Sequence, residues 1–80
     1  MGRHSSRYPW TNTEPGFWTM SAWFGQEQLI YRAESFGTGW QVHRWVAGAA
    51  DKDGTLLAFG LPSLLAARQV AEADAPGALM

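Results

Sequence analysis

The chain has 80 residues, 46% of them hydrophobic, and this length allows one small domain with a single core. It contains no cysteine, which excludes disulfides, thiolate metal ligands and a cysteine nucleophile. Six basic and seven acidic residues give a net charge of −1, so the chain lacks the basic excess that is typical of nucleic-acid-binding proteins.

The first sixteen residues are polar, contain two prolines and show no period. Residues 1–16 are therefore predicted to form an irregular arm, with Trp10 as its anchor. The N-terminus lacks the apolar core of a signal peptide, and no apolar run approaches the ~20 residues that a membrane span needs. We expect a cytoplasmic protein without a membrane-bound segment.

Alternating apolar and polar residues predict strands over residues 17–24, 29–35 and 40–46. The segment 51–54, with the sequence DKDG, has the composition of a turn and precedes a fourth apolar run at 55–61. The connections between these runs are short, which favours an antiparallel meander over crossover topology.

Ser63 can accept a backbone N–H bond and is predicted to cap a helix over residues 64–73. Small and apolar side chains recur on this helix at helical spacing, and Pro76 and Gly77 end it. The prediction is one α+β domain over residues 17–74 followed by a tail at 75–80. It consists of an antiparallel meander of three to four strands with one C-terminal helix packed on one face.

A helix of about ten residues covers only one face of such a sheet, and the alternation assigns an aromatic set of side chains to the other face. Trp and Arg are enriched at the energetic centres of protein interfaces, so this set is the candidate partner-binding site. Three alternatives would bury the set as ordinary core: cover by the N-terminal arm, cover by a second chain, or a different strand register. The residues are Phe17, Trp23, Ile30, Arg32, His43 and Trp45.

Other kinds of site find little support in the sequence. Asp51 and Asp53 resemble the opening of a calcium loop, but Pro62 stands where the closing Glu is needed. His4 and His43 have no partner at metal-ligand spacing, and neither a nucleophile elbow nor a phosphate-binding loop is present. We expect no enzymatic activity, no metal and no cofactor.

A meander followed by a helix that begins S-L-x-x-A-R-x-x-A resembles the arm-type DNA-binding domain of tyrosine-recombinase integrases and the related plant ethylene-response domain. It also resembles small accessory proteins of actinobacterial phages and prophages. The matching positions lie within residues 40–72 and are Ser63, Leu64, Ala67, Arg68 and Ala71. In the DNA-binding families the sheet carries several Arg and Lys toward the DNA, and the candidates here are Arg32 and Arg44.

Two functions are consistent with these observations. The first is a non-enzymatic protein-binding module, such as a phage factor that modulates a host protein, which buries Trp23 and Trp45 in a partner while Arg32 pairs with a carboxylate. Its partner would be a host or phage protein, or a second copy of the chain. The second is a nucleic-acid-binding module that uses the same face together with Arg3, Arg7, Arg32 and His43.

Overall fold

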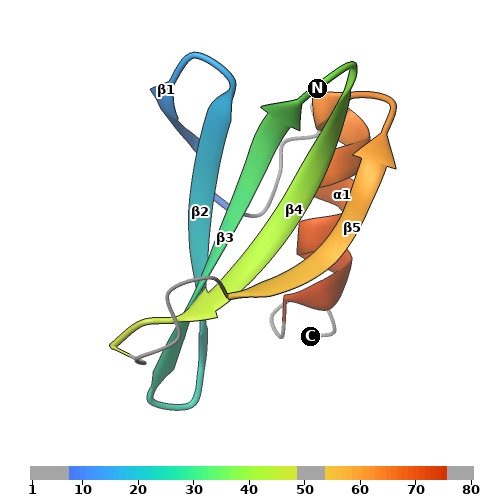
Figure 1. The fold of residues 1–80 in the computed structure, drawn as a ribbon. Coiled ribbons are helices and arrows are strands. Elements are labelled where there is room, and N and C mark those ends of the chain that lie inside the picture. Colours follow the sequence, from blue (N-terminus) through green and yellow to red (C-terminus); the bar gives the residue numbers. More distant parts are fainter. Residues whose placement is uncertain (1–7, 49–53, 76–80) are drawn as a thin grey trace, which may run out of the picture.

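One antiparallel sheet backed by one helix forms the structure, a computed structural model that describes residues 8–48 and 54–75 (Figure 1). The strands lie across the sheet in chain order, so each consecutive pair is antiparallel and adjacent. The predicted α+β class and antiparallel meander are confirmed. The elements are β1 Thr11–Glu14, β2 Phe17–Phe24, β3 Glu27–Phe36, β4 Gly39–Val46, β5 Thr55–Leu61 and α1 Leu64–Asp74.

The sheet has five strands, so the prediction of three to four was wrong. The additional strand is β1, which lies within the segment expected to be irregular. Its four residues are polar and exposed, and no apolar alternation marks them. Besides its pairing with β2, side-chain hydrogen bonds stabilise β1: Asn12 Nδ2 donates to the backbone oxygens of Glu14 at 2.8 Å and Phe17 at 2.9 Å.

Two-residue turns set the register of the three central strands. Phe24 pairs with Glu27 around the first turn, and Phe36 pairs with Gly39 around the second. Each turn begins with a glycine at positive φ, 63° at Gly25 and 64° at Gly37. Left-handed residues of this kind match the twist of a two-residue hairpin, so both hairpins fix which side chains share a face.

The core lies between the sheet and α1, which crosses β3, β4 and β5 on one face (Figure 1). Tyr31 and Val42 are the largest fully buried side chains, and they pack with Ala67 and Ala71 from the helix. Alanine at the contact lets the helix lie close to the sheet, as the helical spacing predicted. The helix begins where expected, since Ala66 N donates to Ser63 Oγ at 3.1 Å.

The described end of the N-terminal arm packs on the helix side of the sheet. Tyr8 and Trp10 contact the core cluster, and Trp10 Nε1 donates to Glu72 Oε2 at 2.7 Å. The guanidinium of Arg68 lies 5.7 Å from the Trp10 ring centroid. This part of the arm is therefore anchored to α1 and does not cover the opposite face.

A buried tyrosine and an arginine join the C-terminal end of α1 to the sheet. Tyr31 Oη donates to Asp74 Oδ2 at 2.8 Å, and Arg44 Nη1 contacts the same oxygen at 2.8 Å. Burial, and then the hydrogen bond to Asp74, raise the pKa of Tyr31 above its usual range. The bond to Asp74 also raises the pKa of Arg44. The Arg44 side chain thus faces α1 and is paired with Asp74 there.

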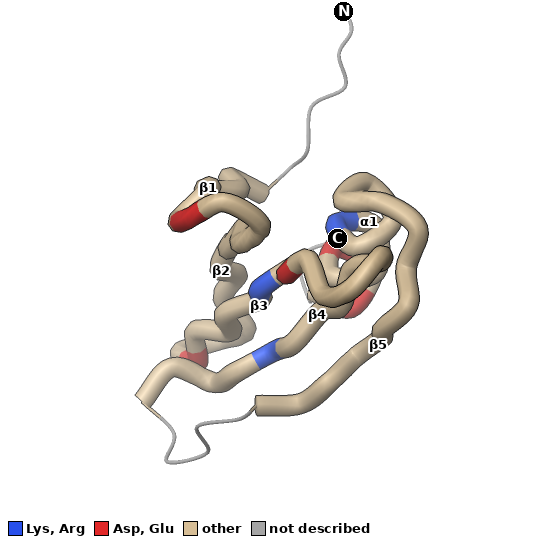
Figure 2. Tube along the Cα trace, turned by 45° about the horizontal axis from the view of Figure 1, so that its top comes forward, with Lys and Arg blue, Asp and Glu red and all other residues tan. Residues whose placement is uncertain are grey.

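Charge is sparse in the sheet, and β2 and β5 carry none (Figure 2). Within residues 8–48 and 54–75, no helix is long and apolar enough to cross a membrane. Several sequence predictions lie outside the described residues and have no structural counterpart here. They concern the turn at 51–53, Arg3, His4, Arg7, and the helix stop at Pro76 and Gly77.

Candidate functional site

The six candidate binding residues lie on the sheet face opposite α1, which we call the open face. Strand pairing shows this directly, because Thr19, Arg32, His43 and Leu56 stand opposite one another in one row across β2 to β5. The neighbouring row contains Ser21, Ile30 and Trp45. Alternation from these rows places Phe17 and Trp23 on the same side. Their shared face is established, and their role in binding stays a prediction.

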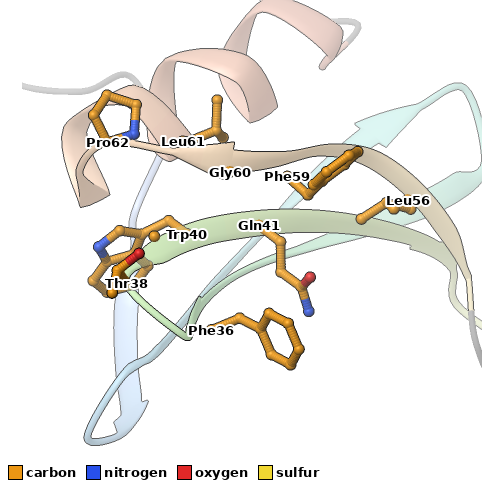
Figure 3. Close-up of a pocket in the computed structure, with 10 residues that line it drawn as sticks. Phe36, Thr38, Trp40, Gln41, Leu56, Phe59, Gly60, Leu61 and Pro62 are labelled. Carbon is orange, nitrogen blue, oxygen red and sulfur yellow. The ribbon is translucent and has the colours of Figure 1, made fainter.

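A groove of about 470 Å³ opens at one end of the open face, beside the turn between β3 and β4. Figure 3 shows Phe36 and Gln41 projecting from β3 and β4 to the side away from α1, with Leu56 and Phe59 on β5. Phe36 is 68% exposed and Phe59 is 73% exposed. Three aromatic side chains, Phe36, Trp40 and Phe59, line the groove together with the Gln41 amide, which suits an apolar side chain with a polar group beside it.

Sequence reasoning missed this groove because β5 does not alternate regularly. Its pairing with β4 shifts register around Val42, so Ala58 stands opposite Val42 while Leu56 stands opposite His43. A bulge of this kind breaks the period-2 pattern, so that Leu56 and Ala58, two positions apart, lie on opposite faces. The run of four apolar residues gave no sign of which side chains would be exposed. Phe36 follows the strand predicted over residues 29–35 and so fell in the predicted connection, although it is the last residue of β3.

The centre of the open face is a stack of rings around one guanidinium. Arg32 Cζ lies 4.8 Å from the Trp45 ring centroid and 5.5 Å from the Phe17 ring centroid. The His43 ring also stacks on the Trp45 ring. Their centroids are 5.5 Å apart and the angle between the ring planes is 30°. Cation–π contact and stacking hold these side chains in place before any partner arrives. Four of the six predicted residues are thus brought together.

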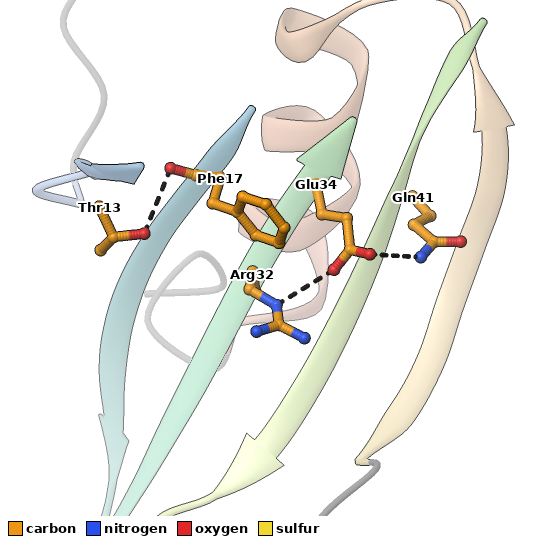
Figure 4. Close-up of polar contacts among 5 residues, drawn as sticks. All are labelled: Thr13, Phe17, Arg32, Glu34 and Gln41. Carbon is orange, nitrogen blue, oxygen red and sulfur yellow. Dashed lines mark hydrogen bonds and ion pairs between the residues drawn. The ribbon is translucent and has the colours of Figure 1, made fainter. Parts of the chain in front are cut away.

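A polar chain continues from this stack toward the groove (Figure 4). Arg32 Nε lies 3.2 Å from Glu34 Oε1, an ion pair without hydrogen-bond geometry. Gln41 Nε2 donates to the other carboxylate oxygen, Glu34 Oε2, at 3.0 Å. The Arg32 side chain is 37% exposed, whereas that of Glu34 is 16% exposed. The Glu34 carboxylate therefore compensates the positive charge of Arg32, and the exposed part of the Arg32 guanidinium can still contact a partner.

Trp23 does not belong to the stack and does not lie beside Trp45. Trp23 pairs with Gln28, whereas Trp45 pairs with Ile30 on the other side of β3. One strand and two residue positions separate them, which corresponds to about 12 Å between their Cα atoms. Trp23 is 63% exposed near the tip of the β2–β3 hairpin. Alternation predicted the correct face for both rings but did not predict their separation.

The charge on the open face limits what it can bind. Arg32 is the basic residue that the described strands place there, because Arg44 turns to α1. Neutralising several phosphates needs several free cations, and the described part of the face does not supply them. Nor do the described residues gather three His, Asp or Glu side chains in a way that could hold a metal ion. What the face offers is apolar, aromatic and nearly neutral.

Comparison of the chain with protein-family models, with curated proteins and with solved structures gave no match.

Proposed function

We propose that this protein is a non-enzymatic module that binds another protein through its open face. The observation that carries the proposal is the exposure of large aromatic side chains on a sheet face whose described charges, Arg32 and Glu34, compensate each other. Large apolar patches on small domains are typical of interaction sites. Rings that are already stacked lose little conformational freedom on binding, which favours a strong contact.

The partner is expected to insert an apolar side chain between Phe36 and Phe59 and to cover the stack of Phe17, Arg32 and Trp45. The groove supplies a concave site for such an anchor, and Gln41 supplies an amide beside it. The exposed part of the Arg32 guanidinium can pair with a carboxylate at the edge of the contact. The resemblance to small phage proteins makes a host protein the expected partner.

Nucleic acid is the competing ligand, because bases stack on aromatic side chains and Arg32 lies between two rings. The two functions differ in their dependence on salt. Binding that neutralises several phosphates weakens steeply as salt rises, whereas an apolar protein contact changes little. The compensated charge on the described open face supports the protein partner.

The test is capture from a lysate of the host cell on the immobilised full chain, followed by mass spectrometry of the retained proteins. Two variants with the same chemical change are compared with the wild-type protein. Phe59→Lys puts a charge on the groove wall at a side chain that is 73% exposed. Leu65→Lys is the control, because Leu65 is 62% exposed on α1, away from the open face.

A partner that uses the open face is retained by the wild-type protein and by Leu65→Lys. Phe59→Lys is expected to weaken its affinity by at least about tenfold, because an aromatic anchor contributes about 2 kcal/mol or more. Retention should survive nuclease treatment and 0.5 M salt. Loss of all specific species on nuclease treatment, or equal loss with both variants, would contradict the proposal.

A further inference from the structure

β2 has a free edge that the other described strands leave unpaired. β1 pairs with Phe17, Trp18 and Thr19, and then ends. The following segment of β2, residues 20–24, pairs with β3 in regular register on its other side. It contains no charge, no proline and no register shift on the paired side. Natural proteins normally protect an edge of this kind with one of those features, so this edge is suited to accept another strand.

Hairpin geometry shows which backbone groups of this edge are available. A two-residue turn closes on a hydrogen-bonded pair, here Phe24 with Glu27, and the pattern alternates along the strand. The N–H and C=O of Ser21 and Trp23 therefore point away from β3. The bond from Asn12 Nδ2 to the Phe17 backbone oxygen supports this direction, since Phe17 is in phase with Ser21 and Trp23. Four backbone groups are thus available to an incoming strand.

The surface beside this edge is hollowed, and four of the seven side chains that line the hollow are polar: Thr11, Thr19, Ser21 and Gln28. A depression of about 350 Å³ lies there, lined in part by Pro9, Met20 and Ser21. Near the turn that ends the hairpin, Trp23 and Phe24 project on opposite faces of the sheet, each 63% exposed. An incoming strand would therefore find both a cavity and two uncovered rings along one edge.

We propose that a second copy of this chain occupies the edge, with the two β2 strands antiparallel about a two-fold axis at Ala22. In this register Ser21 stands opposite the partner's Trp23 and exchanges both backbone hydrogen bonds with it. The same holds in reverse, so all four available groups are used. Met20 stands opposite the partner's Phe24 on the helix side, and the partner's Trp23 ring lies beside the hollow, whose lining includes Ser21 and Ile30 of the open face.

The self-pairing register is selected by the structure. A shift that paired the incoming strand with Thr19 is blocked because Thr19 already pairs with Thr11 of β1. In the central register the partner's strand ends at Phe24, opposite Met20, and only its turn residue Gly25 comes opposite Thr19. A shift toward the hairpin tip would leave the groups of Ser21 opposite the turn residue Gly25 of the other copy. The central register places the small Ala22 side chains together on the axis and each large ring opposite a different residue. The available backbone groups and the sizes of the paired side chains therefore both favour the register in which Ala22 stands opposite Ala22.

A copy of the chain fits better than an open series of chains because the arrangement closes on itself. Each chain contributes one such edge, so a two-fold pair uses both and leaves none. The outer edge of β5 is a poorer acceptor, since its register shifts twice and Gly60 has a φ of 69°. The pair would form one continuous sheet with the two open faces side by side, and this does not depend on the proposed function.

The test is sedimentation velocity of the full chain from about 1 to 200 μM, a range chosen because so small an interface is expected to bind weakly. Ser21→Pro removes the outward N–H without removing a bond to β3. Ser21→Ala is the matched control, because it changes the side chain and keeps the N–H. We expect the wild-type protein and Ser21→Ala to form a dimer, and Ser21→Pro to raise the dissociation constant at least about tenfold.

A cysteine experiment supplies a second readout if Ser21→Pro unfolds. The chain has no cysteine of its own. Residues opposite each other in a non-hydrogen-bonded antiparallel pair have Cα atoms about 4.5 Å apart, within disulfide range, so Ala22→Cys should link two chains on mild oxidation. Phe59→Cys, on the other edge strand, is the control and should not.

Several results would overturn the inference. A wild-type chain that remains monomeric throughout this range excludes the dimer. Association that continues beyond two copies excludes the closed arrangement. A folded Ser21→Pro that dimerises as the wild-type protein does, or equal cross-linking of both cysteine variants, excludes the β2 edge as the contact.

Discussion

Replacing Tyr31 with Phe is expected to lower the free energy of unfolding by about 1–2 kcal/mol. The substitution deletes one oxygen from a fully buried ring and thereby the 2.8 Å bond to Asp74 Oδ2. A hydrogen bond to a charged group contributes about 1.5–3 kcal/mol. The value expected here lies at and just below the lower end of that range, because the Asp74 side chain is 31% exposed and still contacts Arg44. The bond joins α1 to the sheet, so its loss loosens the whole core.

Urea denaturation followed by tryptophan fluorescence measures this change. For a domain of this size the expected loss corresponds to a melting temperature roughly 6–12 °C lower. Leu65→Ala is the control, because Leu65 is 62% exposed on α1 and its truncation should change the free energy of unfolding much less. A loss below about 0.5 kcal/mol for Tyr31→Phe would refute the idea that this bond fastens the helix to the sheet.

The same variant should differ from the wild-type protein at high pH. Because the folded pKa of Tyr31 is raised, the unfolded chain loses this proton first, near pH 10, while the folded chain keeps it. Above about pH 10 the unfolded state binds fewer protons, so stability falls by up to about 1.4 kcal/mol per pH unit. The stabilisation is fully present below pH 10. Tyr31→Phe should lack this alkaline loss, and equal pH profiles above pH 10 would contradict the assignment.

Substitutions at three further positions test how the sheet and helix are built, each measured by urea denaturation. Ser63→Ala removes the acceptor for the first turn of α1 and should cost about 1 kcal/mol, whereas Ser63→Asp should cost less. Gly54→Ala should destabilise by more than about 1 kcal/mol, because φ is 71° and a Cβ there would lie 2.7 Å from Trp45. Trp10→Phe deletes the bond to Glu72 and should cost about 0.5–1.5 kcal/mol; no change would mean that the arm is not anchored.

The regular parts of the fold could be predicted because one local rule decides them. Alternation gave the faces of β2, β3 and β4, since two-residue turns keep all three strands in phase. Spacing and a capping serine gave α1. In each case residues close together in the sequence determine the structure, so the element can be predicted without knowledge of contacts between distant residues.

The remaining parts depend on contacts between distant residues. β1 is polar and is recognised only through its bonds to the start of β2. Leu56 and Phe59 line the groove because the register of β5 shifts against β4. A continuous run of apolar residues does not show where such a shift occurs. Arg32 and Trp45 were assigned to one face, but their stacking depends on side-chain conformations that alternation does not specify.

The most direct test of protein binding by the open face uses the five tryptophan indoles as reporters in a heteronuclear NMR spectrum. Trp45 reports on the open face, whereas Trp10, Trp18 and Trp40 pack against the core on the helix side. When a captured partner is added to the labelled chain, the account predicts that the Trp45 indole signal shifts or broadens while those of Trp10 and Trp18 stay in place. Shifts confined to Trp10 and Trp18, with Trp45 unchanged, would contradict it.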